Sequence, residues 1–147
     1  MARRSYRGMS IQDFGPLYHG THVADLETVD STVAPDRHST GMPGGHTRRG
    51  ANFVTTSYDD ARGYAEHSAA LMTRKNSHLG QQFEPHVYEV EPTNKRMEHW
   101  EPDEHSGSGG WYDGPQSRRE AHEIGSQGGA VSLRLTTPLR VKGRVED

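Results

Sequence analysis

The chain has 147 residues, a formal net charge of −3 and no cysteine. This length suits one domain, because two cores of half the size would each be too small to be stable alone. The lack of cysteine excludes disulfide bonds, a thiolate nucleophile and Cys-ligated zinc. No apolar run approaches the ~18 residues of a membrane helix, and no apolar segment follows the basic start as in a secretory signal. We therefore expect residues 1–147 to form a single soluble, cytoplasmic domain without a membrane partner.

The first part of the chain contains two predicted strands separated by a long loop. Residues 1–13, with three arginines among the first seven positions, are predicted to form a polar basic arm. Residues 16–21 (PLYHGT) predict a short strand that runs into a Gly turn. Residues 22–50 are rich in turn formers and predict a surface loop, and loops of this length are usually functional or disordered. Residues 51–56 (ANFVTT) then predict a buried strand.

The clearest predicted element is an amphipathic helix over residues 58–74. Ser57 precedes it at a position that suits an N-cap, and Asp60 three residues later completes the pattern of a capping box. Apolar side chains recur at intervals of three and four residues, which predicts one buried face. The members of this face are Tyr58, Ala61, Tyr64, Ala65, Ala69 and Met72.

The rest of the chain predicts three more strands. Residues 86–91 alternate between apolar and polar side chains and stop at a proline. Residues 93–129 form a second irregular region with room for a short helix near 117–123. Residues 131–135 and 139–145 both alternate, and they are predicted to pair as an antiparallel hairpin with one core face and one basic face. This order predicts a small α+β domain with a largely antiparallel sheet, few helices and long loops.

Three common kinds of site find little support. The ten histidines suggest a metal site, but an H-E-x-x-H helix starting at His122 would need a histidine where Ser126 stands. The Gly-rich stretch 107–110 neither follows a strand nor precedes Lys-Ser/Thr, so it fails as a phosphate-binding loop. The basic face of the last hairpin suits a solvated surface better than a nucleic-acid contact, because no aromatic side chains interleave it. We expect no metal, and we do not expect nucleic acid as a partner.

Several short motifs occur in order along residues 17–146. They are Tyr18-His19-Gly20-Thr21, Asn52-Phe53-Val54-Thr55, Ala61-x-x-Tyr64-Ala65, Val90-Glu91-Pro92 and Pro138-Leu139-Arg140-Val141-Lys142-Gly143-Arg144-Val145. With these motifs the chain resembles the ADP-ribosyltransferase fold, and in particular the rifamycin ADP-ribosyltransferase family. The resemblance implies a split, largely antiparallel sheet and NAD as the co-substrate.

The resemblance also implies a role for each matched residue. His19 would hydrogen-bond a ribose hydroxyl of NAD, the Gly20 backbone would pair with the nicotinamide carboxamide, and Thr21 would brace the turn. Phe53 and Tyr64, eleven residues apart, would stack on the two faces of the nicotinamide ring. The family more often has Tyr where this chain has Phe53. The alternative interpretation is a buried turn histidine and two core aromatics.

A catalytic carboxylate is expected as well, because breaking the bond between nicotinamide and ribose develops positive charge on the sugar. The rifamycin family places an Asp shortly after Val-Glu-Pro, and Glu98 is the first candidate in the corresponding stretch. Glu101 and Asp103 are the next candidates. Glu120 and Glu123 remain alternatives if the loop over 107–129 folds back.

The activity that the resemblance implies is transfer of ADP-ribose from NAD to an acceptor, either a small molecule such as a rifamycin or a protein. The long segments 22–50 and 93–129 would shape the acceptor site. One alternative is a catalytically degenerate domain that assembles with other proteins, for example in a phage head, and is then located in the particle. Another is a nucleic-acid-binding module, whose affinity would fall steeply with salt.

Overall fold

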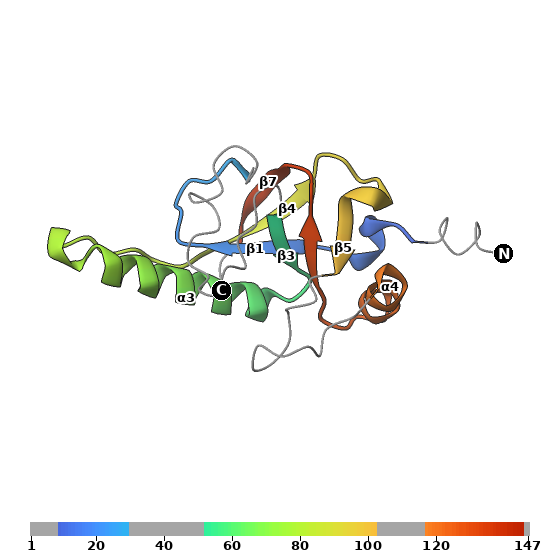
Figure 1. The fold of residues 1–147 in the computed structure, drawn as a ribbon, viewed down its shortest axis with the longest axis horizontal. Helices are drawn as coiled ribbons and strands as arrows, with labels where there is room; N and C mark the ends of the chain where they lie inside the picture. The colour runs from blue at the N-terminus through green and yellow to red at the C-terminus, as the bar shows by residue number, and fades with distance from the viewer. Residues whose placement is uncertain (1–8, 30–51, 103–116, 146–147) are drawn as a thin grey trace.

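A computed structural model describes residues 9–29, 52–102 and 117–145, which form two α-helices and seven strands (Figure 1). The predicted α+β class is confirmed, and each predicted strand and the long helix begin and end within one residue of their predicted bounds. The elements, with three short 3-10 helices labelled η, are η1 (Ile11–Phe14), β1 (Leu17–Thr21), β2 (Thr28–Val29), β3 (Asn52–Thr55), α3 (Tyr58–Lys75), η2 (Ser77–Leu79), β4 (His86–Pro92), η3 (Met97–His99), β5 (Trp100–Pro102), α4 (Arg118–Ser126), β6 (Ser132–Leu135) and β7 (Leu139–Val145).

The segments predicted to be irregular contain more structure than expected. β2 and β5 lie within them, and α4 runs three residues past the helix predicted near 117–123. The polar arm predicted over residues 1–13 is wrong in its last part, because Ile11 belongs to η1 and is buried. The remaining parts of these predictions, residues 1–8, 30–50 and 103–116, lie outside the described residues.

The strands form one antiparallel sheet in the order β2-β7-β4-β1-β3-β6-β5. β1 pairs with β4 along all five of its residues, but it pairs with β3 only where Tyr18 lies opposite Thr55. β3 then pairs with β6 from Asn52 to Thr55. The sheet therefore consists of two halves joined at one register pair: the β1 half (β2, β7, β4 and β1) and the β3 half (β3, β6 and β5).

The predicted hairpin between the last two strands is wrong. β6 pairs with β3 and β5, β7 pairs with β4 and β2, and three strands separate β6 from β7. Four strand spacings in a flat sheet amount to about 19 Å, whereas the link from Leu135 to Leu139 spans at most about 14 Å. The two halves must therefore curve toward each other, so that β6 ends close to the start of β7.

The link between these strands, residues 136–138, is held by segments that precede both of them in the chain. Asn52 on β3 donates a 2.8 Å hydrogen bond from Nδ2 to the carbonyl oxygen of Thr137. The backbone nitrogen of Thr93, which follows β4, donates a 2.9 Å bond to the carbonyl oxygen of Pro138. In a hairpin, the polar backbone groups of the turn would form hydrogen bonds within the two strands that it connects. Here the partners are distant in sequence, which explains why the local pattern suggested a hairpin.

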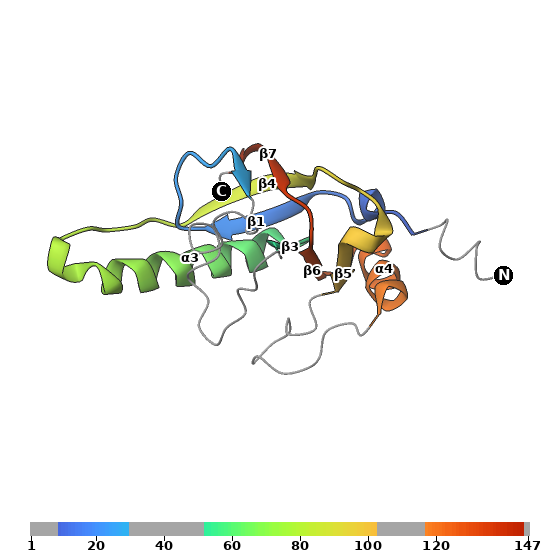
Figure 2. The same cartoon turned by 45° about the horizontal axis from the view of Figure 1, so that its top comes forward.

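The main apolar core lies between the inward faces of the two halves. Buried side chains from both halves meet there: Leu17, Tyr88, Val90 and Leu139 from the β1 half, and Val54, Trp100, Leu133 and Leu135 from the β3 half. The ring of Trp100 packs edge-on against Phe14 of η1, with 5.3 Å between centroids. η1 and α4 lie together at the end of the molecule opposite the free end of α3 (Figure 2).

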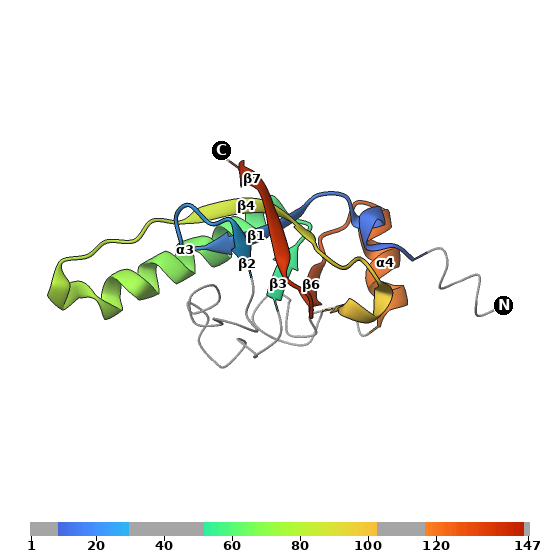
Figure 3. The same ribbon diagram turned by 90° about the horizontal axis from the view of Figure 1, so that it is seen from above.

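α3 covers the other face of the β1 half and extends well beyond the sheet (Figure 3). The predicted N-cap is confirmed, because Ser57 Oγ accepts a 3.1 Å hydrogen bond from the backbone nitrogen of Asp60. Ala61 is fully buried in a small second core between α3 and the sheet. A Cβ on Gly20 would overlap the carbonyl oxygen of Ala61, so the helix can approach β1 this closely only because residue 20 is glycine.

α4 packs against η1 in a similarly close contact. A Cβ on Gly125 would overlap the ring of Phe14. His122 Nε2 lies 2.9 Å from Asp13 Oδ2, and this hydrogen bond holds the pKa of Asp13 below its usual value. These contacts fix the segment that leads into β1, and β1 carries three of the predicted site residues.

Candidate functional site

His19 bridges the two halves of the sheet beside the point where β1 and β3 stop pairing. Its side chain is buried, and its Nδ1 lies 2.8 Å from the backbone oxygen of Phe53. Because a carbonyl oxygen can only accept, Nδ1 carries a proton and donates this hydrogen bond. His19 therefore supplies a bond between β1 and β3 where the strand ladder has ended.

The side chains of His19 and Phe53 nevertheless point to opposite faces of the sheet. Tyr18 and Thr55 lie opposite each other and share a face. Phe53, two residues from Thr55, shares that face, whereas His19, one residue from Tyr18, points to the other. The Nε2 atom of His19 is buried as well, so a ribose hydroxyl would reach it only after local opening. The structure brings His19 to the backbone of Phe53 and not to its ring.

Gly20 and Thr21, the next two predicted site residues, serve the local structure. The backbone of α3 fills the space that a Cβ of Gly20 would need, so helix packing accounts for this glycine without a ligand. Thr21 is buried, and its Oγ1 accepts a 3.1 Å hydrogen bond from the backbone nitrogen of Val23. This bond fixes the direction of the chain after β1.

Phe53 and Tyr64 lie on the same side of the sheet and are both half-buried. Phe53 occupies the face that α3 covers in the β1 half, and Tyr64 is on α3, which begins three residues after β3 ends. Within the described residues, the structure shows no ring contact between the two. The two aromatics are thus placed on one side, and the predicted clamp around a third ring stays a prediction.

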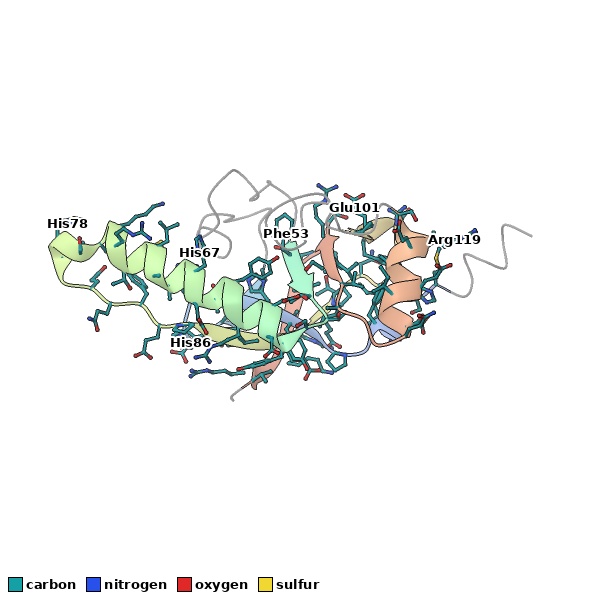
Figure 4. All side chains as sticks on the ribbon, turned by 90° about the horizontal axis from the view of Figure 1, so that it is seen from below. Phe53, His67, His78, His86, Glu101 and Arg119 are labelled. Carbon is teal, nitrogen blue, oxygen red and sulfur yellow. The ribbon has the colours of Figure 1, made fainter. Side chains whose placement is uncertain are left out.

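A row of three side chains crosses the β3 half and starts at Phe53. Phe53 on β3 lies opposite Arg134 on β6, and Arg134 lies opposite Glu101 on β5. Directly opposite residues share a face, so a ring, a guanidinium and a carboxylate stand in line within about 10 Å. Arg134 and Glu101 form an ion pair, with 20% and 37% of their side chains exposed. Figure 4 shows Phe53 and Glu101 along the same edge of the molecule.

Glu101 is the one predicted acid that the structure places in this row. Glu98, the first candidate, lies in η3 with 65% of its side chain exposed, and it is 3.6 Å from Arg96 and 3.8 Å from His99. The geometry therefore favours Glu101 over Glu98. Glu120 and Glu123 are exposed on α4 and are not in the row, and Asp103 lies outside the described residues.

Arg134 is the residue of this row that the sequence analysis missed as a site residue. The alternation of β6 marks it as outward-facing, but the predicted hairpin assigned it to one basic surface together with Arg140 and Lys142. In the structure those two residues belong to the β1 half, where Arg140 pairs with Glu91 and Lys142 pairs with Glu89. The Arg140 guanidinium also lowers the pKa of Glu91. Pairing with acids across β4 makes this surface a poor match for a phosphate backbone.

A surface hollow of about 330 Å³ lies apart from the row. Its walls come from η1, the start of β1, the end of β4, the segment after β4, and β7. None of the predicted site residues lines it. The hollow therefore adds nothing to the case for a dinucleotide site.

No protein-family model matches the chain, and a search of curated proteins finds no match either. Within residues 9–29, 52–102 and 117–145, no three histidine or acidic side chains come together as metal ligands. In that same part of the chain, no helix is both long and apolar enough to cross a membrane. The chemistry of the row and its neighbours is therefore the basis for a function.

Proposed function

We propose that the chain is an NAD-dependent mono-ADP-ribosyltransferase with the ADP-ribosyltransferase fold. The row of Phe53, Arg134 and Glu101, beside a sheet whose halves join at one register pair, is the observation that carries this proposal. NAD consists of a flat cationic ring, two riboses, a pyrophosphate and an adenine. The row offers a ring that can stack, a carboxylate that can stabilise a cation and a guanidinium that suits phosphate.

Each residue of the site then has a distinct role. Phe53 stacks on the nicotinamide ring, and Tyr64 of α3 covers the other face of that ring. Glu101, in preference to Glu98, provides the negative charge opposite the reacting ribose. His19 acts as a positioning residue, because its hydrogen bond holds the backbone of Phe53 beside β1.

The proposed reaction needs little covalent chemistry from the protein. The bond between the ring nitrogen of nicotinamide and C1′ of ribose breaks, and its electron pair leaves with nicotinamide, which becomes neutral. A nucleophilic atom of the acceptor forms the new bond to C1′ and loses its proton to solvent. Because nicotinamide is a good leaving group, positioning and charge stabilisation supply most of the acceleration. The acceptor is a small molecule or a protein.

The test combines calorimetric titration with NAD and an assay for released nicotinamide. We expect the wild-type protein to bind NAD and release nicotinamide. Glu101→Gln should bind NAD at least as tightly as the wild type but release nicotinamide roughly 100-fold more slowly, because a charge used in the transition state is gone. Glu98→Gln, a nearby exposed acid, is the matched control and should behave as wild type. A wild-type protein that neither binds NAD nor releases nicotinamide would contradict the proposal.

A second candidate function keeps NAD binding without the transfer. It is favoured by the ion pair with Arg134, which neutralises part of the charge of Glu101, and by the missing hydroxyl at Phe53. Such a domain would assemble with other proteins, as in a phage head. Tight NAD binding by the wild-type protein without any release of nicotinamide, with or without candidate acceptors, would support this function over the enzyme.

A further inference from the structure

The ion pair between Arg134 and Glu101 conflicts with the role of Glu101 in the proposed reaction. A carboxylate that is paired with a guanidinium presents little net negative charge to a third group. The Arg134 side chain is only 20% exposed and that of Glu101 is 37% exposed, so solvent screens this pair only in part. The ribose can therefore use the full charge of Glu101 only if Arg134 finds another partner.

We propose that Arg134 is the phosphate-binding residue of the site, and that it moves from Glu101 to the pyrophosphate when NAD binds. This inference rests on the proposed function and adds to it a residue that determines specificity for a dinucleotide. The exchange breaks no covalent bond. In the free protein, Arg134 neutralises the charge of Glu101. When the phosphates are present, Arg134 contacts them, and the charge of Glu101 becomes available to the ribose.

The position and chemistry of Arg134 both fit this exchange. Arg134 stands between Phe53 and Glu101 and is one strand spacing, about 5 Å, from each. In NAD the reacting ribose is bonded to the nicotinamide ring on one side and to the pyrophosphate on the other. Ring, sugar and phosphate must therefore bind within the same short distance. The guanidinium fork suits phosphate oxygens, and a pyrophosphate offers two negative charges where Glu101 offers one.

Two probes separate the phosphate contact from the ring contact. ADP-ribose has the pyrophosphate but lacks the nicotinamide ring, and nicotinamide riboside has the ring and the ribose but no phosphate. In calorimetric titrations, Arg134→Gln should weaken ADP-ribose binding about tenfold, and it should not weaken the binding of nicotinamide riboside, a cation for which Glu101 is then unpaired. Arg134→Lys keeps the charge but loses the forked geometry of the guanidinium, so its affinity for ADP-ribose should lie between those of the wild type and Arg134→Gln.

Glu101→Gln provides an opposite signature that a merely structural ion pair cannot produce. Removing the competing carboxylate should tighten ADP-ribose binding roughly two- to fivefold. Glu101→Gln also keeps the inference testable if Arg134→Gln does not fold. It retains Arg134 and replaces only the carboxylate of Glu101 with an uncharged amide of the same size.

Arg140→Gln is the matched control. It breaks the same kind of cross-strand pair, with Glu91, in the other half of the sheet, and it should leave both affinities unchanged. Wild-type protein that binds neither NAD nor ADP-ribose would contradict the proposed function itself. Wild-type protein that binds ADP-ribose, with equal binding by Arg134→Gln or weaker binding by Glu101→Gln, would overturn the role of Arg134 alone.

Discussion

The Nδ1 atom of His19 lies 2.8 Å from the carbonyl oxygen of Phe53, so a β1 side chain binds the β3 backbone beyond the single register pair of the two strands. Such a bond sets the distance between the two halves of the sheet at the candidate site. Its donor is an imidazole, and its acceptor is the backbone of the residue whose ring begins the row with Arg134 and Glu101.

Replacing His19 with Ala should lower the free energy of unfolding by ~1–3 kcal/mol, because the carbonyl of Phe53 then loses its donor in a part-buried hydrogen bond. His19→Asn retains an N–H near the position of Nδ1 and should recover part of this loss. Urea denaturation of the three proteins measures the effect. If His19→Ala were as stable as wild type, the hydrogen bond would not hold the halves together. NAD affinity, titrated under conditions in which both variants are folded, should fall in the same order as stability.

Replacing Gly20 with Ala should destabilise the protein strongly, because the new Cβ meets the backbone of α3, which cannot give way as a side-chain end can. Gly63→Ala is a matched control within α3, since a Cβ there meets nothing within 4 Å. That variant should gain ~0.5–1 kcal/mol from the higher helix propensity of Ala. Thermal melts of both variants check the pair. A Gly20→Ala protein as stable as wild type would show that α3 does not pack on β1 as closely as described.

Replacing Phe53 with Ala should weaken NAD binding by roughly 2- to 13-fold, which corresponds to a lost stacking contact of ~0.5–1.5 kcal/mol. Phe53→Tyr should keep both stability and binding, because the side chain is half-exposed and a hydroxyl there reaches water. Phe83→Ala is the control: this ring is also half-buried, but it packs against His22 and should not affect NAD. A Phe53→Tyr protein that melts markedly lower would instead assign Phe53 to the core.

The stability of the protein should fall as the pH drops below about 6.5, the usual pKa of histidine. Burial, and secondly the Arg144 guanidinium, hold the pKa of His86 below that value, and the carboxylates of Glu84 and Asp25 oppose this only in part. The unfolded chain then binds a proton that the folded chain does not, so the stability present above pH 6.5 is lost on acidification. Melting temperatures of wild type and His86→Gln between pH 8 and 5 test this, and the variant should show the shallower decline.

The sequence patterns predicted the individual elements well, because their signals are local. Ser57 caps α3 as predicted, and the alternation over residues 86–91 became β4 almost unchanged. The pairing of the strands depends on contacts that are distant in sequence. The bond from Asn52 to Thr137 joins residues 85 positions apart, and nothing in the three residues between β6 and β7 indicates that the chain crosses between the two halves there.

The candidate site was predictable only where neighbours in sequence are also neighbours in space. Phe53 and Tyr64 could be assigned to one side of the sheet because a single tight turn connects β3 to α3. Arg134 and Glu101 could not be joined to Phe53, because their register depends on which strands lie next to β3. The same uncertainty made Glu98 the first candidate, since spacing alone does not reveal which acid lies in a strand.

The crossover of residues 136–138 also bears on how the chain folds while it is synthesised. β3 lacks its neighbour β6, and β4 lacks its neighbour β7, until residues 132–145 have left the ribosome. Residues 132–135 supply β6 and residues 139–145 supply β7, so both halves lack a strand until the last part of the domain is made, and the unfinished chain exposes open strand edges. Nascent chains stopped before Ser132 should therefore be cleaved by protease in both halves, and full resistance should appear only once β7 emerges.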